Sequence, residues 1–337
     1  MFQSSSRIAA CLLLVAATRA VSAQESPQRA FDHHVHVLSP RLIADWKSLG
    51  MAFSRPDDSY TEPVGIMSQA EIDGACLISM AHLYATEDFR AICPTQDLER
   101  RLVSAENDFV AVSVARSPGK LVGYYSVNLL RDYAFDELKR CRANPNLTGL
   151  KLHLPACGFE LENQEHLKRL TEVLTWAEQE RAPVLLHLTA GEDVDLERAL
   201  WFWQSVIEPH PRLEIQLAHL GSVGGFNGSS ESILVGYQLR ALANPAFRQM
   251  SIYFDLSGAI IVDNPEIPAT SDERCRRLSE LMLRIGVDHF LFASDYPVFS
   301  IAETRASLVD RLALPPDDLR TLFATRARCV MAETERD

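Results

Sequence analysis

Two histidines separated by one residue stand near the start of the chain, at the end of an apolar run. The run reads Phe31-Asp32-His33-His34-Val35-His36. Residues i and i+2 of a strand point to the same side, so His34 and His36 would face one space, with Asp32 below them. Two converging imidazoles can bind one divalent metal ion. An H-x-H pair alone is weak support, because single histidines often only fill surfaces.

Polar residues also end three later apolar runs. His187 follows Val184-Leu185-Leu186, His219 follows Ile215-Gln216-Leu217-Ala218, and Asp295 follows Phe290-Leu291-Phe292-Ala293-Ser294. Any one of them could be a satisfied core residue, and Asp295, which precedes Tyr296-Pro297, could simply start a turn. Buried polar groups are costly unless they are paired or bound to a metal. The recurrence of the pattern therefore favours a common site.

Eight strand-length apolar runs must position these residues. Several are continuously apolar, as expected for strands buried on both faces. The runs are 30–38, 74–80, 121–127, 148–154, 182–188, 213–220, 251–256 and 289–294. Between them lie amphipathic stretches with helical spacing, at 135–142, 163–181, 196–207, 232–243 and 272–285. Segment 43–68 lacks clear periodicity, and we expect an elaborated loop over the active-site end.

Strands that alternate with helices predict parallel β-α units, and eight of them predict an α/β fold of the closed (β/α)8 barrel type. In such a barrel the carboxyl ends of all strands meet on one face, where active sites are built. The main alternative is an open doubly wound sheet. That alternative loses its usual support because no G-x-G-x-x-G motif follows an early strand.

Residues 1–23 have the pattern of a secretory signal peptide. Arg7 precedes the apolar run 8–17, and Val21-Ser22-Ala23 precedes Gln24. An uncleaved anchor is the alternative, although the run is too short to span a bilayer. We therefore expect a single barrel domain, residues 24–337, that is periplasmic or secreted. Cys76 lies in an apolar run and is expected to be a buried thiol.

The bulk composition limits the partners. The net charge is −12, the pI is about 5.3, and no run of lysine or arginine is present. These values argue against nucleic acid and, after signal cleavage, against membranes as partners. Hydrophobic residues make up 47% of the chain, which is ordinary for a soluble globular protein with a sizeable core. A small-molecule substrate is compatible with this balance, and a homo-oligomer stays open.

These motifs resemble those of the amidohydrolase superfamily. More narrowly, the chain is similar to the amidohydrolase-2 branch, which includes the aminocarboxymuconate-semialdehyde decarboxylase-like enzymes. The resemblance extends from about Phe31 to about Met331. It is carried by the H-x-H pair, Gly149-Leu150-Lys151-Leu152-His153, His187, Ala218-His219-Leu220-Gly221 and Ser294-Asp295-Tyr296-Pro297.

The resemblance implies a metal centre with assigned roles. His34, His36, His187 and Asp295 would hold one divalent ion, with Zn²⁺ the first expectation and Mn²⁺ or another divalent ion the alternative. Asp295 and His219 would be catalytic. Asp295 would take a proton from metal-activated water, and His219 would serve as an acid, a base or an oxyanion-stabilising group.

Four further residues are candidates for substrate binding. Lys151 could be a carboxylated bridge between two metals, but we favour a buried cation paired with a carboxylate, with Asp32 as the candidate partner. His153 would face the substrate. His82 and Arg131 follow strands whose loops reach the same face, where an arginine could hold a substrate carboxylate. A solvated loop is the alternative for both.

The sequence therefore leads first to a metal-dependent hydrolase that acts on a small ester, lactone or amide through metal-activated water. A metal-dependent, non-oxidative decarboxylase of an aromatic or unsaturated carboxylic acid needs the same ligands, and the secretion signal tilts the choice to hydrolysis. A non-enzymatic metal-binding barrel is the third hypothesis. The presence of both Asp295 and His219 speaks against it.

Overall fold

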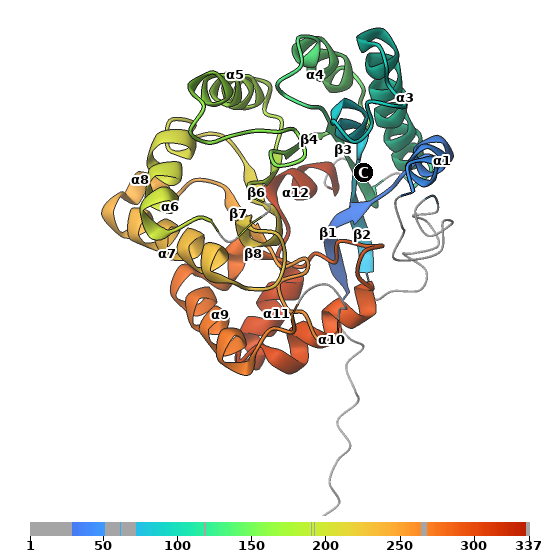
Figure 1. Ribbon diagram of the computed structural model, residues 1–337. Coiled ribbons are helices and arrows are strands. Elements are labelled where there is room, and N and C mark those ends of the chain that lie inside the picture. The colour runs from blue at the N-terminus through green and yellow to red at the C-terminus, as the bar shows by residue number, and fades with distance from the viewer. Residues whose placement is uncertain are drawn as a thin grey trace, which may run out of the picture.

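The computed structural model describes residues 29–50, 61, 72–117, 119–189, 191, 193–263 and 268–334. Eight parallel strands form one sheet in which each strand pairs with the next along the chain (Figure 1). They are β1 (Ala30–His36), β2 (Ile72–Ile78), β3 (Leu121–Ser126), β4 (Gly149–His153), β5 (Val184–His187), β6 (Ile215–Leu217), β7 (Ile252–Asp255) and β8 (Phe290–Leu291). Each strand lies inside, or within two residues of, an expected apolar run.

The barrel closes through the segment that follows β8 rather than through β8 itself. The amide of His33 donates to the carbonyl of Phe292 (3.0 Å), and the amide of His36 donates to the carbonyl of Tyr296 (2.7 Å). In the other direction, the amide of Asp295 donates to the carbonyl of His34 (2.8 Å). These bonds confirm the predicted (β/α)8 barrel, and they fix Asp295 beside the first strand.

Helices surround the strands on the outside (Figure 1). They are α1 (Pro40–Ser48), α3 (Gln96–Ala115), α4 (Ala134–Arg142), α5 (Gln164–Glu180), α6 (Leu196–Phe202), α7 (Gly228–Ala243), α8 (Pro245–Arg248), α9 (Asp272–Ile285), α10 (Ile301–Arg311), α11 (Pro316–Ala324) and α12 (Arg328–Thr334). Short helical turns follow β2 (η2, Ala81–Ala85), α6 (η3, Trp203–Ile207), β6 (η4, Ala218–Gly221) and α9 (η5, Val287–His289).

The start of α12 packs against side chains of the barrel strands. Cys329 and Val330 join a buried cluster with Cys76 of β2, Val122 of β3 and Leu185 of β5. This apolar cluster supports the inward-facing polar residues above it, because a packed interior leaves them little freedom to move. As expected, Cys76 is a buried free thiol, and every described cysteine is free.

The expectation of a loop at 43–68 is wrong at its start. Pro40–Ser48 forms α1, whose N-cap Ser39 accepts a hydrogen bond from the amide of Leu42 and whose first residue is a proline. Residues 51–60 and 62–71 lie outside the described residues. The sequence also did not predict α3, which begins after the N-cap Thr95 and packs on β3.

Residues 1–28 lie outside the described part of the chain, so the signal peptide at 1–23 stays a prediction. The described helices include none that is both long enough and apolar enough to cross a bilayer.

Candidate functional site

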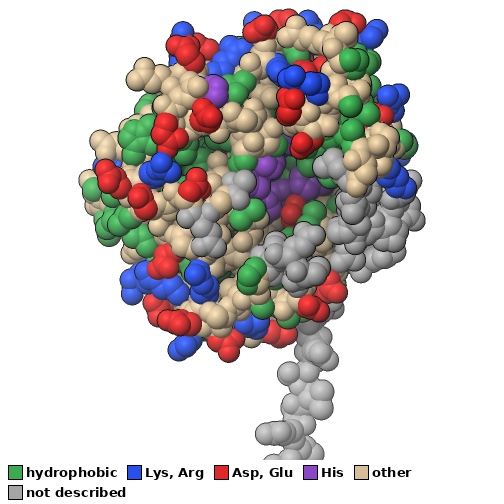
Figure 2. Space-filling view, in the orientation of Figure 1, with side chains coloured by type: hydrophobic (Ala, Val, Ile, Leu, Met, Phe, Trp, Pro, Cys, Tyr) green, Lys and Arg blue, Asp and Glu red, His purple; other side chains and the backbone are tan. Residues whose placement is uncertain are grey.

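His34, His36 and Asp295 form a compact donor cluster at the carboxyl end of the barrel. His34 and His36 are two residues apart on β1, and their Nε2 atoms lie 3.2 Å from each other. One oxygen of Asp295 lies 3.0 Å from Nε2 of His36 and 3.5 Å from Nε2 of His34. Figure 2 shows histidine side chains together with an acidic side chain at the bottom of a hollow in the centre of this face.

Asp295 is held in position by an uncommon backbone conformation. Its φ of 61° lies in the left-handed region, and its amide is tied to the carbonyl of His34. Burial opposes ionisation of its carboxylate. The hydrogen bond from His36 and the charges of His34 and His219 outweigh that effect, and they hold the pKa of Asp295 well below its usual range. Asp295 is therefore an anion directed at two imidazoles.

Asp255, the last residue of β7, orients the cluster from behind. Its Oδ2 accepts a hydrogen bond from Nδ1 of His34 at 2.9 Å and one from Nε2 of Gln216 at 2.8 Å. Burial opposes ionisation here too, but the neighbouring His34, His219 and Ser257 hold the pKa of Asp255 well below its usual range. A proton on Nδ1 of His34 leaves Nε2 as the lone pair that faces the cluster, which is the usual arrangement of a metal-binding histidine.

His219 faces the same cluster from the turn after β6. Its φ is 53°, and its amide donates to the other oxygen of Asp255 at 2.9 Å. Its Nδ1 lies 2.9 Å from the carbonyl of Ser257, an acceptor only, so this nitrogen carries the proton of the neutral ring. The ring centroid lies 5.0 Å from that of His34. The Nε2 atom of His219 is therefore free to exchange a proton with a bound molecule.

Three further imidazoles extend the cluster along the strand ends as a stack. His187 lies 5.0 Å from His219 and 4.0 Å from His153, and His153 lies 5.2 Å from His82, all between ring centroids. Burial lowers the pKa of all three, that of His82 to about 3, so they are neutral near pH 7. His153 accepts a hydrogen bond at Nδ1 from the amide of Ala156, which leaves its Nε2 as a donor.

His187 lies beside the donor cluster but does not complete it in this arrangement. Its Nε2 lies 3.0 Å from the carbonyl of Thr189. The described residues form two groups whose ligand atoms all lie within 4.8 Å of one another, namely His34-His36-Asp295 and His34-His219-Asp255. His187 is in neither group. Its role as the fourth ligand stays a prediction, because it requires Nδ1 or a turn of the ring.

Lys151 and Asp32 lie deeper in the barrel, and the expected ion pair between them is not formed. The carboxylate of Asp32 instead accepts hydrogen bonds from the amides of His34 (3.1 Å) and Ser294 (3.0 Å). Burial raises the pKa of Asp32 to about 7. Lys151 makes no ion pair within the described chain, and burial lowers its pKa to about 8, against the attraction of Asp255 and Asp295. Its charge faces the carboxylates of the site without touching them.

Arg131 and His82 differ from their expected roles in different ways. Arg131 forms an ion pair with Glu99 at 3.0 Å and donates to the carbonyl of Ala85. It links α3 to the loop after β3, so the structure does not bring it to the cluster. His82 does join the row of imidazoles, where its Nδ1 lies 2.6 Å from the hydroxyl of Ser126 and its Nε2 has no hydrogen-bond partner among the residues that the structure describes.

Asp255, Gln216 and Ser257 were not predicted from the sequence. Asp255 follows the same rule as Asp295, since it ends an apolar strand, but Leu256 continues the run and hides the carboxylate within it. A search for polar residues in the last two positions of each apolar run would have found Asp255. Gln216 contacts Asp255, and Ser257 contacts both Asp255 and His219, but neither leaves a comparable signal in the sequence.

The donor set fits a divalent metal ion. Two imidazole Nε2 atoms and a carboxylate oxygen converge, and one imidazole is oriented by a second carboxylate on its other nitrogen. Nitrogen and oxygen donors of this kind suit Zn²⁺, Mn²⁺ and related ions.

Comparisons with known proteins agree with this architecture. The family model described as Amidohydrolase matches residues 31–328. Among curated proteins, none shows significant sequence similarity. Similar solved structures include 5-carboxyvanillate decarboxylase from Sphingomonas paucimobilis, with 16% identity, a TM-score of 0.62, and 92% of this chain and 99% of that chain covered.

Two further structures have the same fold. The 2,6-dihydroxybenzoate decarboxylase from Rhizobium has 16% identity and a TM-score of 0.60, with 90% and 99% of the two chains covered. A dihydroxybenzoic acid decarboxylase from Polaromonas, solved with bound manganese and the inhibitor 2-nitroresorcinol, has 14% identity and a TM-score of 0.60, with 91% and 97% covered. The family match spans most of the chain, and the (β/α)8 barrel carries the donor residues at its carboxyl end. The chain therefore belongs to the amidohydrolase family.

Proposed function

We propose that this protein is a metal-dependent, non-oxidative decarboxylase of a small aromatic or unsaturated carboxylic acid. The observation that carries the proposal is the position of His219, whose ring lies beside the His34-His36-Asp295 cluster and whose Nε2 makes no hydrogen bond with the described residues. This arrangement places a proton carrier next to a site for a cation. The decarboxylases among the similar structures, one of them with bound manganese, support this choice over hydrolysis.

His34, His36 and Asp295 would hold the ion, and His187 would become the fourth ligand if its ring turned. When bound there, a divalent ion would supply Lewis-acid attraction for the oxygens of the substrate. Asp255 keeps the proton on Nδ1 of His34, so that Nε2 remains a ligand. Manganese is the first ion to test, because a similar structure holds it, and zinc is the second.

His219 would move the proton that the reaction consumes. With a proton on Nε2, it donates to the carbon that bears the carboxylate. The bond between that carbon and the carboxylate then breaks, its electron pair restores the unsaturated system, and CO2 leaves. The neutral imidazoles of His153 and His82 would line the substrate side, where a hydrogen bond from Nε2 of His153 can hold a hydroxyl group.

The decisive experiment offers matched substrates to one preparation. Purified protein loaded with Mn²⁺ is incubated in D2O with a panel of hydroxybenzoic acids and, separately, with their methyl esters and with small lactones. The proposal predicts release of CO2 from an acid and one deuterium on the carbon that lost the carboxylate. Hydrolysis of an ester or lactone without CO2 release from any acid would favour the hydrolase instead.

A further inference from the structure

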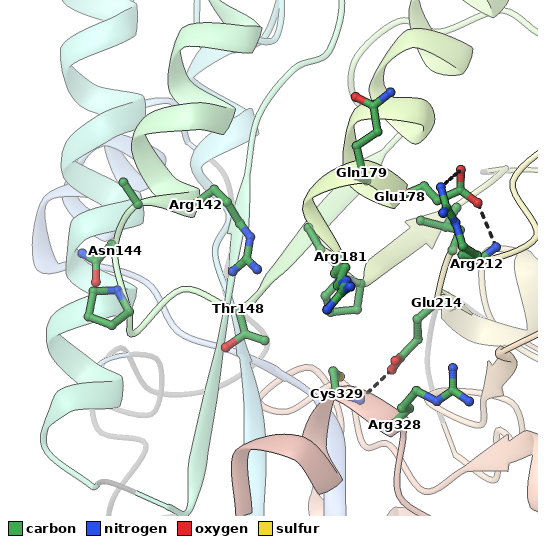
Figure 3. A pocket seen from close by; sticks show the side chains of 16 residues that line it. Arg142, Asn144, Thr148, Glu178, Gln179, Arg181, Arg212, Glu214, Arg328 and Cys329 are labelled. Atoms are coloured by element: carbon green, nitrogen blue, oxygen red, sulfur yellow. Dashed lines mark hydrogen bonds and ion pairs between the residues drawn. The ribbon is translucent and has the colours of Figure 1, made fainter. Parts of the chain in front are cut away.

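The other end of the barrel carries a second cavity, far along the strands from the histidines. It has a volume of about 870 Å³. Its lining includes three residues that immediately precede β4, β5 and β6, namely Thr148, Pro183 and Glu214. These positions place the cavity at the amino-terminal end of the barrel, beside the last turns of α4 and α5 (Figure 3).

Four arginines line this cavity, and three of them form no ion pair with the described residues. Arg212 is neutralised by Glu178, at 3.7 Å between the charged groups. Arg142 donates to the carbonyl of Glu180 at 2.9 Å, so its charge is not cancelled by a carboxylate. Arg181 and Arg328 make no side-chain hydrogen bond or ion pair with the described residues. Figure 3 shows Arg142, Arg181 and Arg328 around the opening.

The acidic groups of the cavity offset only part of this charge. Glu178 forms an ion pair with the guanidinium group of Arg212, and the backbone amide of Arg212 also donates to Glu178 at 2.8 Å. Glu214 accepts a hydrogen bond from the amide of Cys329 at 3.0 Å, and burial raises the pKa of its carboxyl group. Four guanidinium groups thus face two carboxylates in a protein whose net charge is −12. Such a local excess of positive charge attracts anions.

One of these arginines has an uncommon backbone conformation. Arg181 is the C-cap of α5 and has a φ of 54°, in the left-handed region where glycine is the common choice. An arginine at this position costs stability relative to glycine. The walls between the arginines are apolar and include Pro145, Pro183 and Leu213. The cavity therefore combines positive charge with an apolar lining.

We propose that this cavity binds an organic anion that carries at least two negative charges on an apolar body, such as an aryl phosphate or an aromatic dicarboxylate. The anionic group bridges Arg181 and Arg328, and the apolar body lies against Pro145, Pro183 and Leu213. Arginine suits this task because its planar group forms paired hydrogen bonds to phosphate and carboxylate oxygens. The site is separate from the histidine cluster and does not depend on the proposed reaction.

The test uses 1-naphthyl phosphate as the probe, with 1-naphthol as the uncharged match and inorganic phosphate as the match without an apolar body. Binding is measured by calorimetry on the chelator-treated full chain, so that the metal centre does not contribute. The probe should bind more tightly than either match. Arg181→Ala combined with Arg328→Ala should weaken it by at least about tenfold, because two charge-assisted contacts are lost.

The control is Arg90→Ala combined with Arg320→Ala, which removes the same charge from two exposed arginines that do not line the cavity. This variant should bind the probe like the wild type. Because Ala keeps a Cβ at position 181, the test variant does not alter the left-handed strain, and circular dichroism verifies its fold. Absence of binding to the wild type at millimolar probe, equal binding to the test variant, or an equal loss in the control would overturn the proposal.

Discussion

The two ends of this barrel use charge in opposite ways. At the carboxyl end, Asp255 and Asp295 are buried anions. Asp255 accepts hydrogen bonds from His34 and from the amide of His219, and Asp295 lies 3.0 Å from Nε2 of His36. At the amino-terminal end, Arg181 and Arg328 are exposed cations that form no ion pair with the described residues. The first arrangement is rigid before any ligand arrives, whereas the second leaves charge open to solvent. Because catalysis needs preorganised groups, we expect the proposed reaction to take place at the carboxyl end.

The largest expected effect comes from removing the two imidazoles of the H-x-H pair. His34→Ala combined with His36→Ala should reduce bound metal to background, because only Asp295 of the compact cluster remains. Elemental analysis after dialysis measures the result. Arg181→Ala combined with Arg328→Ala is the control at the opposite end and should keep its metal. Full occupancy in the histidine variant would move the centre elsewhere.

Next in size is the loss of the proton carrier. His219→Asn should retain metal but lower kcat by roughly 10²–10⁴-fold, since a positioned acid or base contributes about that much. His187→Ala should instead lose metal first, and activity with it. Metal content and kcat are measured side by side, with His166→Asn on α5 as the matched control. If His219→Asn strips the metal and His187→Ala does not, the two roles are exchanged.

A smaller effect is expected behind the cluster. Asp255→Asn keeps the shape but removes the anion that holds the proton on Nδ1 of His34. Loss of such a supporting partner weakens metal binding by roughly 10–100-fold. Competition with a chelator of known affinity provides the measurement. An unchanged metal affinity would mean that Asp255 does not orient His34 for metal binding, and that other contacts hold the cluster at the carboxyl end in place.

The last prediction concerns a buried carboxylate of α3, and its effect is on stability rather than on metal binding or turnover. Among the described residues, the amide and hydroxyl of Ser39 are the donors to Glu106, and burial raises its pKa from 4.5 to about 7. The folded state therefore holds this proton more tightly than the unfolded state. The resulting stabilisation is full below about pH 4.5 and is lost as the pH rises through about 7. The loss is on the order of 3 kcal/mol.

Glu106→Gln should remove this part of the pH dependence of the unfolding free energy. Denaturant titrations at pH 5 and pH 8 measure the difference between the two proteins. Glu172→Gln, an exposed change on α5, is the matched control and should retain the wild-type slope. A Glu106→Gln slope that equals the wild-type slope would show that Glu106 is as ionised in the folded chain as in the unfolded one.

Much of the fold was predictable because strands that are buried on both faces appear in the sequence as apolar runs. The strand ends also predicted His34, His36, His219 and Asp295, which the structure brings to one face. Tertiary contacts decided the rest. Lys151 and Asp32 share the barrel interior, yet backbone amides satisfy Asp32 instead. No local pattern shows which of several buried donors lies nearest.

Two other differences have local causes. The sequence did not predict helix α1 because it has only nine residues, too few for a clear periodicity. The Ser39-Pro40 pair at its start was the stronger indication of a helix. Arg131 was expected near the substrate because it follows β3, but its side chain turns back to Glu99 on α3. A loop residue can reach several neighbours, and its spacing from a strand does not choose among them.

The most direct test of the account is the number of metal ions that the carboxyl end binds. Chelator-treated protein is titrated with Mn²⁺ while the paramagnetic resonance signal of the free ion is recorded. With one centre at His34, His36 and Asp295, the free-ion signal should stay low up to one equivalent per chain and rise beyond it. A signal that rises from the first addition, or only after two equivalents, would contradict a single metal centre at the carboxyl end of this barrel.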